Sequence, residues 1–201
     1  MKKVVLYSLL MLCFLNLAGC SKKKEISILK DEVSVNTMLV RHNGEVQVAF
    51  VDQFDKDYYK LSELDEFVAK EIASYNKSLG TSEVSIDEVF IRESTAIVIL
   101  TFTGMDQYTA FNDVSASYFK GGIDIDNFVG IPESYINVKD GSNLTKDDAL
   151  KNDKYKVLIV NEAYDIIVDG KIKYYSENAV LVDNDTIQST ADSMTVVVFK
   201  P

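Results

Sequence analysis

The strongest local constraint on this chain is a pair of alternating segments that flank Asn43-Gly44. Apolar and polar residues alternate on both sides of that pair, with the apolar positions at Met38, Val40, Val46, Val48 and Phe50. Alternation with period two predicts strands buried on one face, and Asn-Gly favours the type I′ turn of a tight hairpin. We therefore expect an antiparallel hairpin here, with the folded domain beginning near residue 37.

One segment instead has the spacing of a helix. Its apolar residues recur at intervals of three or four, at Leu64, Val68, Ile72, Tyr75 and Leu79, with Phe67 beside them. That spacing predicts an amphipathic helix over residues 62–79 with one buried face. Ser62 with Asp65 three residues later resembles a capping box at its start, and Gly80 favours its end.

A second hairpin is expected around Glu93-Ser94, between residues 84–92 and 95–103. The later segment is apolar on both faces, which places it inside the sheet. A short helix is expected after Gly104, because apolar residues follow at helical spacing, at Met105, Tyr108 and Phe111.

The C-terminal third reads as antiparallel strands. Residues 155–168 and 171–175 flank Asp169-Gly170, a second two-residue turn signal. Further strands are expected at 179–182 and 195–199. Before them, residues 115–143 show no readable period, and Thr145 with Asp148 favours the cap of a brief helix.

These expected elements define an α+β fold, because helices are inserted between hairpins without the strand-helix alternation of a parallel sheet. We expect a curved antiparallel sheet built from hairpins, with the helix at 62–79 packed on one face. In outline, this order of elements is similar to cystatin-like and NTF2-like arrangements. The chain length suits a single α+β domain over residues 37–201.

The N-terminal segment has the layout of a bacterial secretory signal. Lys2 and Lys3 precede the apolar residues 4–15, and Leu17-Ala18-Gly19-Cys20 resembles a lipobox. In bacterial lipoproteins, which this stretch resembles, the cysteine receives a diacylglyceryl group and the chain is cut before it. The resemblance implies removal of residues 1–19, cleavage between Gly19 and Cys20, and lipidation of Cys20. It also implies anchoring at the extracytoplasmic face of the cell membrane.

A helix that stays in the bilayer is the alternative for this segment. Its uncharged run from Val4 to Cys20 is at the lower limit of the roughly 17 to 25 residues that a spanning helix needs. Because the run ends in a cleavage pattern, we favour the lipid anchor. Residues 20–36 then form a tether, whose lysines at positions 22 to 24 would lie near anionic headgroups. The segment also contains the apolar residues Ile26, Ile28 and Leu29, so part of it could instead form an edge strand.

Two further stretches resemble uncharacterised lipoproteins of anaerobic Gram-positive bacteria. They are Phe54-Asp55-Lys56-Asp57-Tyr58-Tyr59 with the helix that follows, and Tyr164-Asp165 through Gly170-Lys171-Ile172-Lys173-Tyr174-Tyr175-Ser176. The resemblance agrees with a location in the cell envelope and implies no catalytic residue.

Charge and cysteine content exclude several classes of function. The chain holds 21 Lys and Arg against 31 Asp and Glu, a net charge of −10, and loss of Lys2 and Lys3 makes it more negative. An acidic protein is a poor ligand for nucleic acid or for a broad membrane-binding face. Cys13 leaves with the signal and Cys20 is lipidated, so no thiol remains for a disulfide, a zinc site or a nucleophile.

The candidate site residues are few. His42 is the single histidine, and we expect it in the solvent-facing hairpin turn without a neighbour, which disfavours Ser-His-Asp catalysis and zinc. Four aspartates are weak calcium candidates because oxygen donors alternate there: Asp124, Asp126, Asp183 and Asp185. The spacing of an EF-hand fails at Phe128. We expect solvated loops there, as for Asp52, Asp55 and Asp57, and no cofactor.

Two functions remain open: a non-enzymatic binding or interaction module of the cell envelope, or an envelope hydrolase that uses paired carboxylates, with or without calcium. A cleft with two carboxylates roughly 5 to 9.5 Å apart would favour the hydrolase, and a shallow surface with exposed tyrosines would favour binding. The partners expected are the membrane, through the anchor, and an envelope protein or ligand. Three aromatic pairs are expected to place one ring in the core and one outside: Tyr58-Tyr59, Tyr118-Phe119 and Tyr174-Tyr175.

Overall fold

The computed structural model describes residues 26–121 and 130–201. The expected signal peptide, Gly19, Cys20 and the two calcium candidates Asp124 and Asp126 lie outside the described residues. Within the described ranges, no helix is both long and apolar enough to cross a bilayer.

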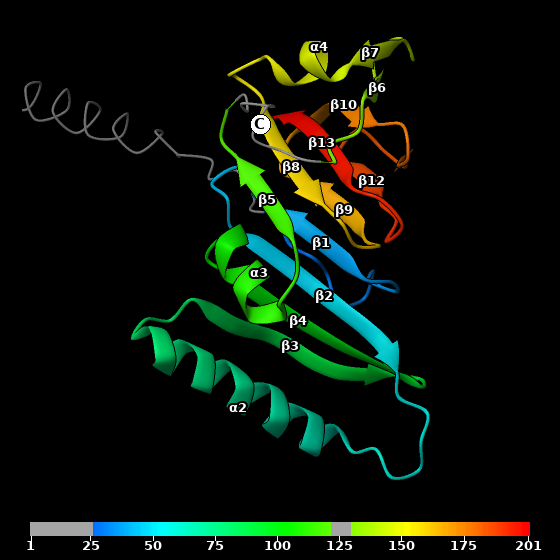
Figure 1. Ribbon diagram of the computed structural model, residues 1–201. Helices are drawn as coiled ribbons and strands as arrows, with labels where there is room; N and C mark the ends of the chain where they lie inside the picture. Colours follow the sequence, from blue (N-terminus) through cyan, green and yellow to red (C-terminus); the bar gives the residue numbers. More distant parts are fainter. Residues whose placement is uncertain (1–25, 122–129) are drawn as a thin grey trace, which may run out of the picture.

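The fold is α+β, as expected, but its strands form two sheets rather than one (Figure 1). The helices are α2 (Leu61–Leu79), α3 (Met105–Asn112) and α4 (Lys146–Leu150). The seven-stranded sheet has, in spatial order, β11 (Val180–Leu181), β12 (Thr186–Gln188), β9 (Asp165–Val168), β1 (Thr37–Val40), β2 (Val46–Gln53), β4 (Thr95–Phe102) and β3 (Val84–Arg92). The six-stranded sheet has β5 (Ala116–Phe119), β8 (Lys156–Val160), β13 (Thr195–Lys200), β10 (Lys171–Ser176), β6 (Ser134–Asn137) and β7 (Asn143–Thr145).

The prediction of a single antiparallel sheet is wrong because the chain changes sheets twice near Asp169-Gly170. The segment 155–168 divides into β8 and β9, which belong to different sheets. The expected hairpin around Asp169-Gly170 is absent, since β9 pairs with β1, in parallel, and with β12, whereas β10 pairs with β13 and β6. A Cβ at Gly170 would lie 2.8 Å from the carbonyl carbon of Lys200. Glycine is therefore needed there for close passage of two backbones, not for a hairpin turn.

The local elements agree with most expectations. The hairpin of β1 and β2 forms, as does that of β3 and β4, and β4 lies inside the sheet between β2 and β3. The first turn differs from type I′, because Gly44 has a positive φ of 98° and Asn43 does not. Gly44 N–H donates to the Arg41 carbonyl, and Arg41 N–H to the Glu45 carbonyl, both at 2.9 Å. This is the three-residue loop whose last residue is left-handed, a conformation that glycine adopts easily.

Helix α2 begins one residue earlier than expected and lacks the expected capping box. Its N-cap is Lys60, without a side-chain cap hydrogen bond, so Ser62 lies inside the first turn. The end is as predicted, since Gly80 is left-handed with a φ of 71° and its N–H binds the last turn. Ile72 is the buried residue of the helix, while Phe67 and Leu79 are exposed. The helix therefore lies on the margin of the core. The brief helix α4 is capped as expected, by Thr145 Oγ1 accepting from Asp148 N at 3.3 Å.

Three clusters of buried apolar residues hold the two sheets and the helices together. The main cluster lies between facing sides of the two sheets and extends under α2 and α3. A second cluster packs the outer face of the six-stranded sheet against α4, through Ala149 and Leu150. The third covers the outer face of the seven-stranded sheet with Ile28 and Val33. The two sheets thus cover one another only in part, and α2 and α3 cover part of the remaining face of the larger sheet (Figure 1).

The described part of the expected tether packs against the domain. Residues 26–36 contain no strand, yet Ile28 is 8% exposed and Val33 is 5% exposed. Ile28 N–H donates to Gln47 Oε1 at 2.7 Å, and Arg92 Nη1 donates to the Val33 carbonyl at 2.8 Å. The segment is neither a free tether nor an edge strand. It is an irregular cover over the third cluster.

Candidate functional site

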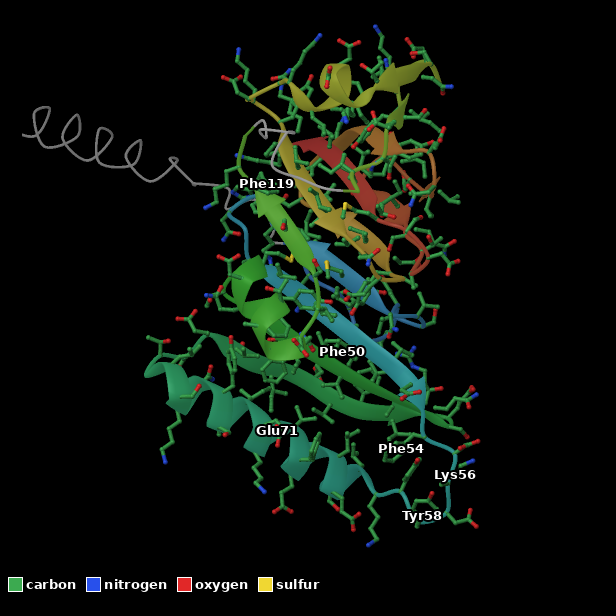
Figure 2. All side chains as sticks on the ribbon, in the orientation of Figure 1. Phe50, Phe54, Lys56, Tyr58, Glu71 and Phe119 are labelled. Carbon is green, nitrogen blue, oxygen red and sulfur yellow. The ribbon has the colours of Figure 1, made fainter. Side chains whose placement is uncertain are left out.

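An apolar groove of about 550 Å³ lies between α2, α3 and the face of β2 and β4. Its lining residues are Phe50, Phe67, Val68, Glu71, Ser74, Tyr75, Ser78, Val98, Leu100, Phe111 and Asn112. Figure 2 shows Phe50 on β2 and Glu71 on α2, on opposite sides of this space. The volume is that of a site for a small ligand, within the usual range of about 300 to 1,000 Å³.

The groove follows from the two periodicities of the sequence. Phe50 continues the row of β2 residues that faces the main cluster, and Val98 and Leu100 face the same way on β4. Helix α2 contributes Val68 and Tyr75, which share one helical face. Because α2 lies against the edge strand β3 and α3 lies over the inner strands, the sheet between them stays uncovered (Figure 1).

Contacts between the two helices close one side of the groove. The Tyr75 and Phe111 rings meet edge to face, with centroids 5.2 Å apart. The Tyr75 hydroxyl donates to the Gln107 carbonyl at 3.5 Å, and Phe111 also packs on Phe102, with centroids 5.8 Å apart. The groove therefore has a fixed aromatic wall.

The opposite rim of the groove is exposed and partly polar. Phe67 lines the groove although 61% of it is exposed, so a ligand would cover a ring that water now contacts. Glu71 is the one carboxylate among the described lining residues, and it forms no ion pair with the described residues. Ser74, Ser78 and Asn112 add hydroxyl and amide groups. Such a site suits an apolar or aromatic ligand with a cation or hydrogen-bond donor at one end.

The groove was not identified from the sequence. The signal that could have found it is Phe67, which lies beside the predicted apolar stripe and widens it. A large aromatic residue at the border of a helical stripe is either buried by a neighbour or left exposed, and the period does not distinguish the two.

Outside the groove, exposed aromatic rings gather in the loop after β2. The Phe54 and Tyr59 rings stack with centroids 4.7 Å apart, and Tyr58 meets Tyr59 edge on at 4.9 Å. Figure 2 shows Phe54 and Tyr58 in this loop. Tyr58 is 70% exposed and Tyr59 is 41% exposed, so the prediction that one ring of the pair enters the core is wrong. The neighbouring Tyr58 phenol raises the pKa of Tyr59.

The other two aromatic pairs do not line a surface for ligands. Tyr118 packs against the main cluster and Phe119 against the second cluster. Tyr175 and Tyr174 divide in the same way between those two clusters. Consecutive residues of a strand point to opposite faces, and here both faces of the six-stranded sheet are covered. Both rings of each pair are therefore half-buried.

His42 lies in the hairpin turn as expected, but it has a neighbour. Its Nδ1 contacts Asp169 Oδ2, and the carbonyl of His42 accepts a hydrogen bond from Tyr118 Oη at 3.0 Å. The imidazole side chain is 60% exposed while that of Asp169 is 12% exposed. Asp169 is 127 positions away along the chain, so no local pattern could have indicated the contact.

The calcium candidates that the structure describes form hydrogen bonds with neighbouring residues of their own loop. Asp183 and Asp185 lie in the loop between β11 and β12. Asp183 Oδ1 accepts from Asn184 N at 2.6 Å, and Asp185 Oδ1 accepts from Thr186 Oγ1 at 3.0 Å. Within residues 26–121 and 130–201, no three His, Cys, Asp or Glu side chains gather as a metal-binding group.

A buried polar cluster links α3 to the segment between β8 and β9. The Tyr108 hydroxyl, on a side chain with 0% exposure, donates to Glu162 Oε2 at 2.8 Å and lies 3.1 Å from the Tyr164 hydroxyl. Burial raises the pKa of both tyrosines. Ser189 closes the cluster, since its Oγ accepts from Tyr164 N at 3.0 Å. All these groups have partners within the protein, which is the pattern of a structural network.

Comparison of the chain with models of protein families, with curated proteins and with solved structures finds no match. The geometry of the groove and the charges of the surface are therefore the features from which a function can be inferred.

Proposed function

We propose that this chain is a lipid-anchored binding protein of the cell envelope, located on the extracytoplasmic face of the cell membrane, whose α2–α3 groove takes an apolar ligand. The observation that carries the binding part is the exposed Phe67 at the rim of a groove of about 550 Å³. Exposed large apolar side chains around a concavity are typical of ligand sites. The anchor is supported by the lipobox-like Leu17-Ala18-Gly19-Cys20.

The ligand class follows from the lining. The aromatic wall of Tyr75 and Phe111 favours flat or aliphatic groups, and Glu71 on the rim favours a cation or a hydrogen-bond donor. The envelope hydrolase has less support, because acid/base hydrolysis of glycosides needs two carboxylates and Glu71 is the single one among the described lining residues.

The proposal also covers the type of α+β fold and the absence of a resident cofactor. We propose that strands β1 to β4, with α2 on one face, form a cystatin-like or NTF2-like unit; the order of these elements supports this. We propose no resident cofactor. Calcium at Asp183 and Asp185 is tested by thermal unfolding with and without the ion, since an ion that binds only the folded state raises its stability.

The test of the groove is saturable binding of a neutral hydrophobic dye, N-phenylnaphthylamine, to residues 21–201. Phe67→Asp is expected to weaken dye binding at least tenfold, because it places a charge where an apolar contact of about 1.4 kcal/mol or more is made. The helix should tolerate the change, since Phe67 is 61% exposed.

Leu79→Asp is the matched control. Leu79 lies on the same helix and is 49% exposed, but it does not line the groove. It should leave dye affinity unchanged. Equal affinities of both variants and the unchanged protein would contradict the proposed site.

A further inference from the structure

Lysines gather at one end of the six-stranded sheet. Four adjacent strands in the order β5, β8, β13 and β10 each carry a lysine at that end. These residues are Lys120, directly after β5, Lys156 at the start of β8, Lys200 at the end of β13 and Lys171 at the start of β10. The register places Lys171 opposite Lys200, and Lys156 Nζ donates to the Lys120 carbonyl at 2.7 Å. Lys173 lies two residues further along β10. We call these five residues the lysine end.

The lysine end is distinguished by the number of lysines without an acidic partner that it gathers. Of the nine other described lysines, five form ion pairs, Lys30–Glu88, Lys56–Asp55, Lys60–Glu63, Lys146–Glu133 and Lys151–Asp148, and the four without one are spread over other elements. The five lysines of the lysine end form no ion pair with the described residues. A group of unpaired cations is unusual in a chain with a net charge of −10.

The acids near the lysine end do not cancel this charge. Asp169 contacts His42, and Glu45 pairs with Arg41, so both carboxylates already have cationic or imidazole partners. Asp153 adds an exposed carboxylate whose backbone adjoins Gly121. Asp183 and Asp185 also lie near this end, since they flank Asn184, whose carbonyl accepts a hydrogen bond from Ile172 N at 2.9 Å. The five lysines still outnumber the four carboxylates of Asp153, Asp169, Asp183 and Asp185.

The first described residue of the chain lies at the same end. Ile26 lines a cavity of about 410 Å³ whose charged lining residues are Asp169, Lys171, Lys173 and Lys200. Arg41 holds it there, since Nε and Nη2 donate to the Ile26 carbonyl at 3.2 and 3.0 Å. The chain thus enters the domain beside the lysines, and Figure 1 shows α2 on the far side of the molecule from the tip of β13.

Chain length then limits the distance between this end and the anchor. Six residues, Cys20 to Glu25, precede Ile26, and a fully extended chain of that length spans about 20 Å. Three of them are lysines, at positions 22 to 24. A basic surface held this close to a bilayer meets the field of anionic headgroups, which decays over about 10 Å.

We propose that the lysine end binds the anionic lipid surface of the bilayer in which Cys20 is anchored, and so orients the domain. The inference rests on the anchor part of the proposed function. The proposed membrane contact is a small face of the domain, whereas the negative net charge of the protein disfavours a broad membrane-binding face. With the lysine end on the lipid, the α2–α3 groove points away from the membrane and stays accessible to ligands.

The experiment uses the full-length chain, expressed so that it is processed, extracted from membranes and reconstituted in two kinds of vesicle. One contains phosphatidylcholine alone and the other a mixture with phosphatidylglycerol. Lysines are acetylated with a water-soluble reagent and quantified by mass spectrometry. Anionic lipid should slow acetylation of Lys120, Lys171, Lys173 and Lys200 by about fivefold or more, while Lys70 and Lys77 on α2 keep their rates. High salt should abolish the difference. Equal rates in both vesicles would overturn the proposal.

Two controls separate this inference from the anchor. Flotation of the native chain with vesicles, and its loss in Cys20→Ala, tests the anchor alone, so a chain that floats without protection of the lysine end contradicts only the orientation. In the second control, the triple variant Lys171→Gln, Lys173→Gln, Lys200→Gln should lose protection of Lys120. Lys56→Gln, Lys60→Gln, Lys70→Gln, with the same change of charge, should retain it. Loss in both triple variants would point to net charge and overturn the role of this face.

Discussion

Buried phenols are the residues whose ionisation is most strongly coupled to folding in this protein. Burial raises the pKa of Tyr118 to about 12, against an ordinary value of 10.0, and Asp169 adds to the shift. The Tyr118 hydroxyl also donates to the carbonyl of His42, in the turn between β1 and β2. Tyr118 therefore connects the tip of a hairpin in one sheet to β5 in the other.

We expect stability to fall in the alkaline range because of these phenols. Between pH 10 and 12 the unfolded chain releases the Tyr118 proton while the folded protein retains it. The raised pKa thus contributes stability that is complete below pH 10 and is lost as the pH approaches 12. Urea unfolding as a function of pH measures this slope, and Tyr118→Phe should reduce it.

Tyr155→Phe is the control, since Tyr155 packs on the second cluster whereas Tyr118 packs on the main cluster, and this change should leave the slope unchanged. The hydrogen bond to His42 is lost in Tyr118→Phe at every pH, so the readout is the pH slope and not the absolute stability of the variant. A slope that stays the same in Tyr118→Phe would refute the assignment of the alkaline loss to this phenol.

At the scale of elements, one side chain ties the end of α2 to the start of β3. Asn76, near the end of the helix, donates from Nδ2 to the Val84 carbonyl at 2.8 Å. Its Oδ1 accepts from the N–H groups of Glu83 and Val84 at 2.9 and 3.1 Å. Most helices are held to the core by several buried apolar residues, whereas Ile72 is the buried residue of α2. The hydrogen bonds from Asn76 to the start of β3, which we call the Asn76 clamp, therefore contribute to holding α2 in place.

Asn76→Ala should therefore affect both stability and the groove. Loss of the three hydrogen bonds leaves backbone groups unpaired, and we expect the free energy of unfolding to fall by about 1 to 3 kcal/mol. Because α2 forms one wall of the groove, dye affinity should fall as well. Lys77→Ala changes the adjacent, exposed residue and should alter neither quantity. Dye affinity that is retained in folded Asn76→Ala would show that the clamp does not position the wall.

At the scale of the whole molecule, a single chain holds two sheets together with three apolar clusters. The third cluster depends on residues 26–36, which form no helix or strand. A segment that leads from the proposed membrane anchor is thus part of the folded domain. The short distance between the proposed anchor and the domain, on which the proposed orientation of the lysine end depends, follows from this packing.

Ile28→Ala tests whether this segment stabilises the domain. Ile28 is 8% exposed, and its removal should lower the free energy of unfolding by about 2 kcal/mol or more. Leu29→Ala, at a neighbouring residue that is 49% exposed, should change it by less than about 0.5 kcal/mol. Thermal or urea unfolding compares the two. Equal small effects would mean that residues 26–36 are a tether after all.

The elements that could be predicted from the sequence are those whose signals are local. Alternation on both sides of Asn43-Gly44, the helical spacing up to Gly80 and the Thr145 cap each involve residues within a few positions of one another, and the structure contains all three elements. The α+β class follows from their order. The charge pattern that gives the lysine end could also be read from strand ends, once the strand order was known.

Tertiary structure alone decided which strands share a sheet and which distant residues lie in contact. Residues 155–168 have one apolar period, but the polar interruption at Asn161 and Glu162 allows β8 and β9 to enter different sheets. The contact of His42 with Asp169, the close passage of Gly170 by Lys200, and the groove between α2 and α3 all join distant positions. The spacing of apolar residues and the residues of a turn determine the conformation of one segment. Which other segment it pairs with depends on how the whole chain packs, and no local sequence pattern contains that information.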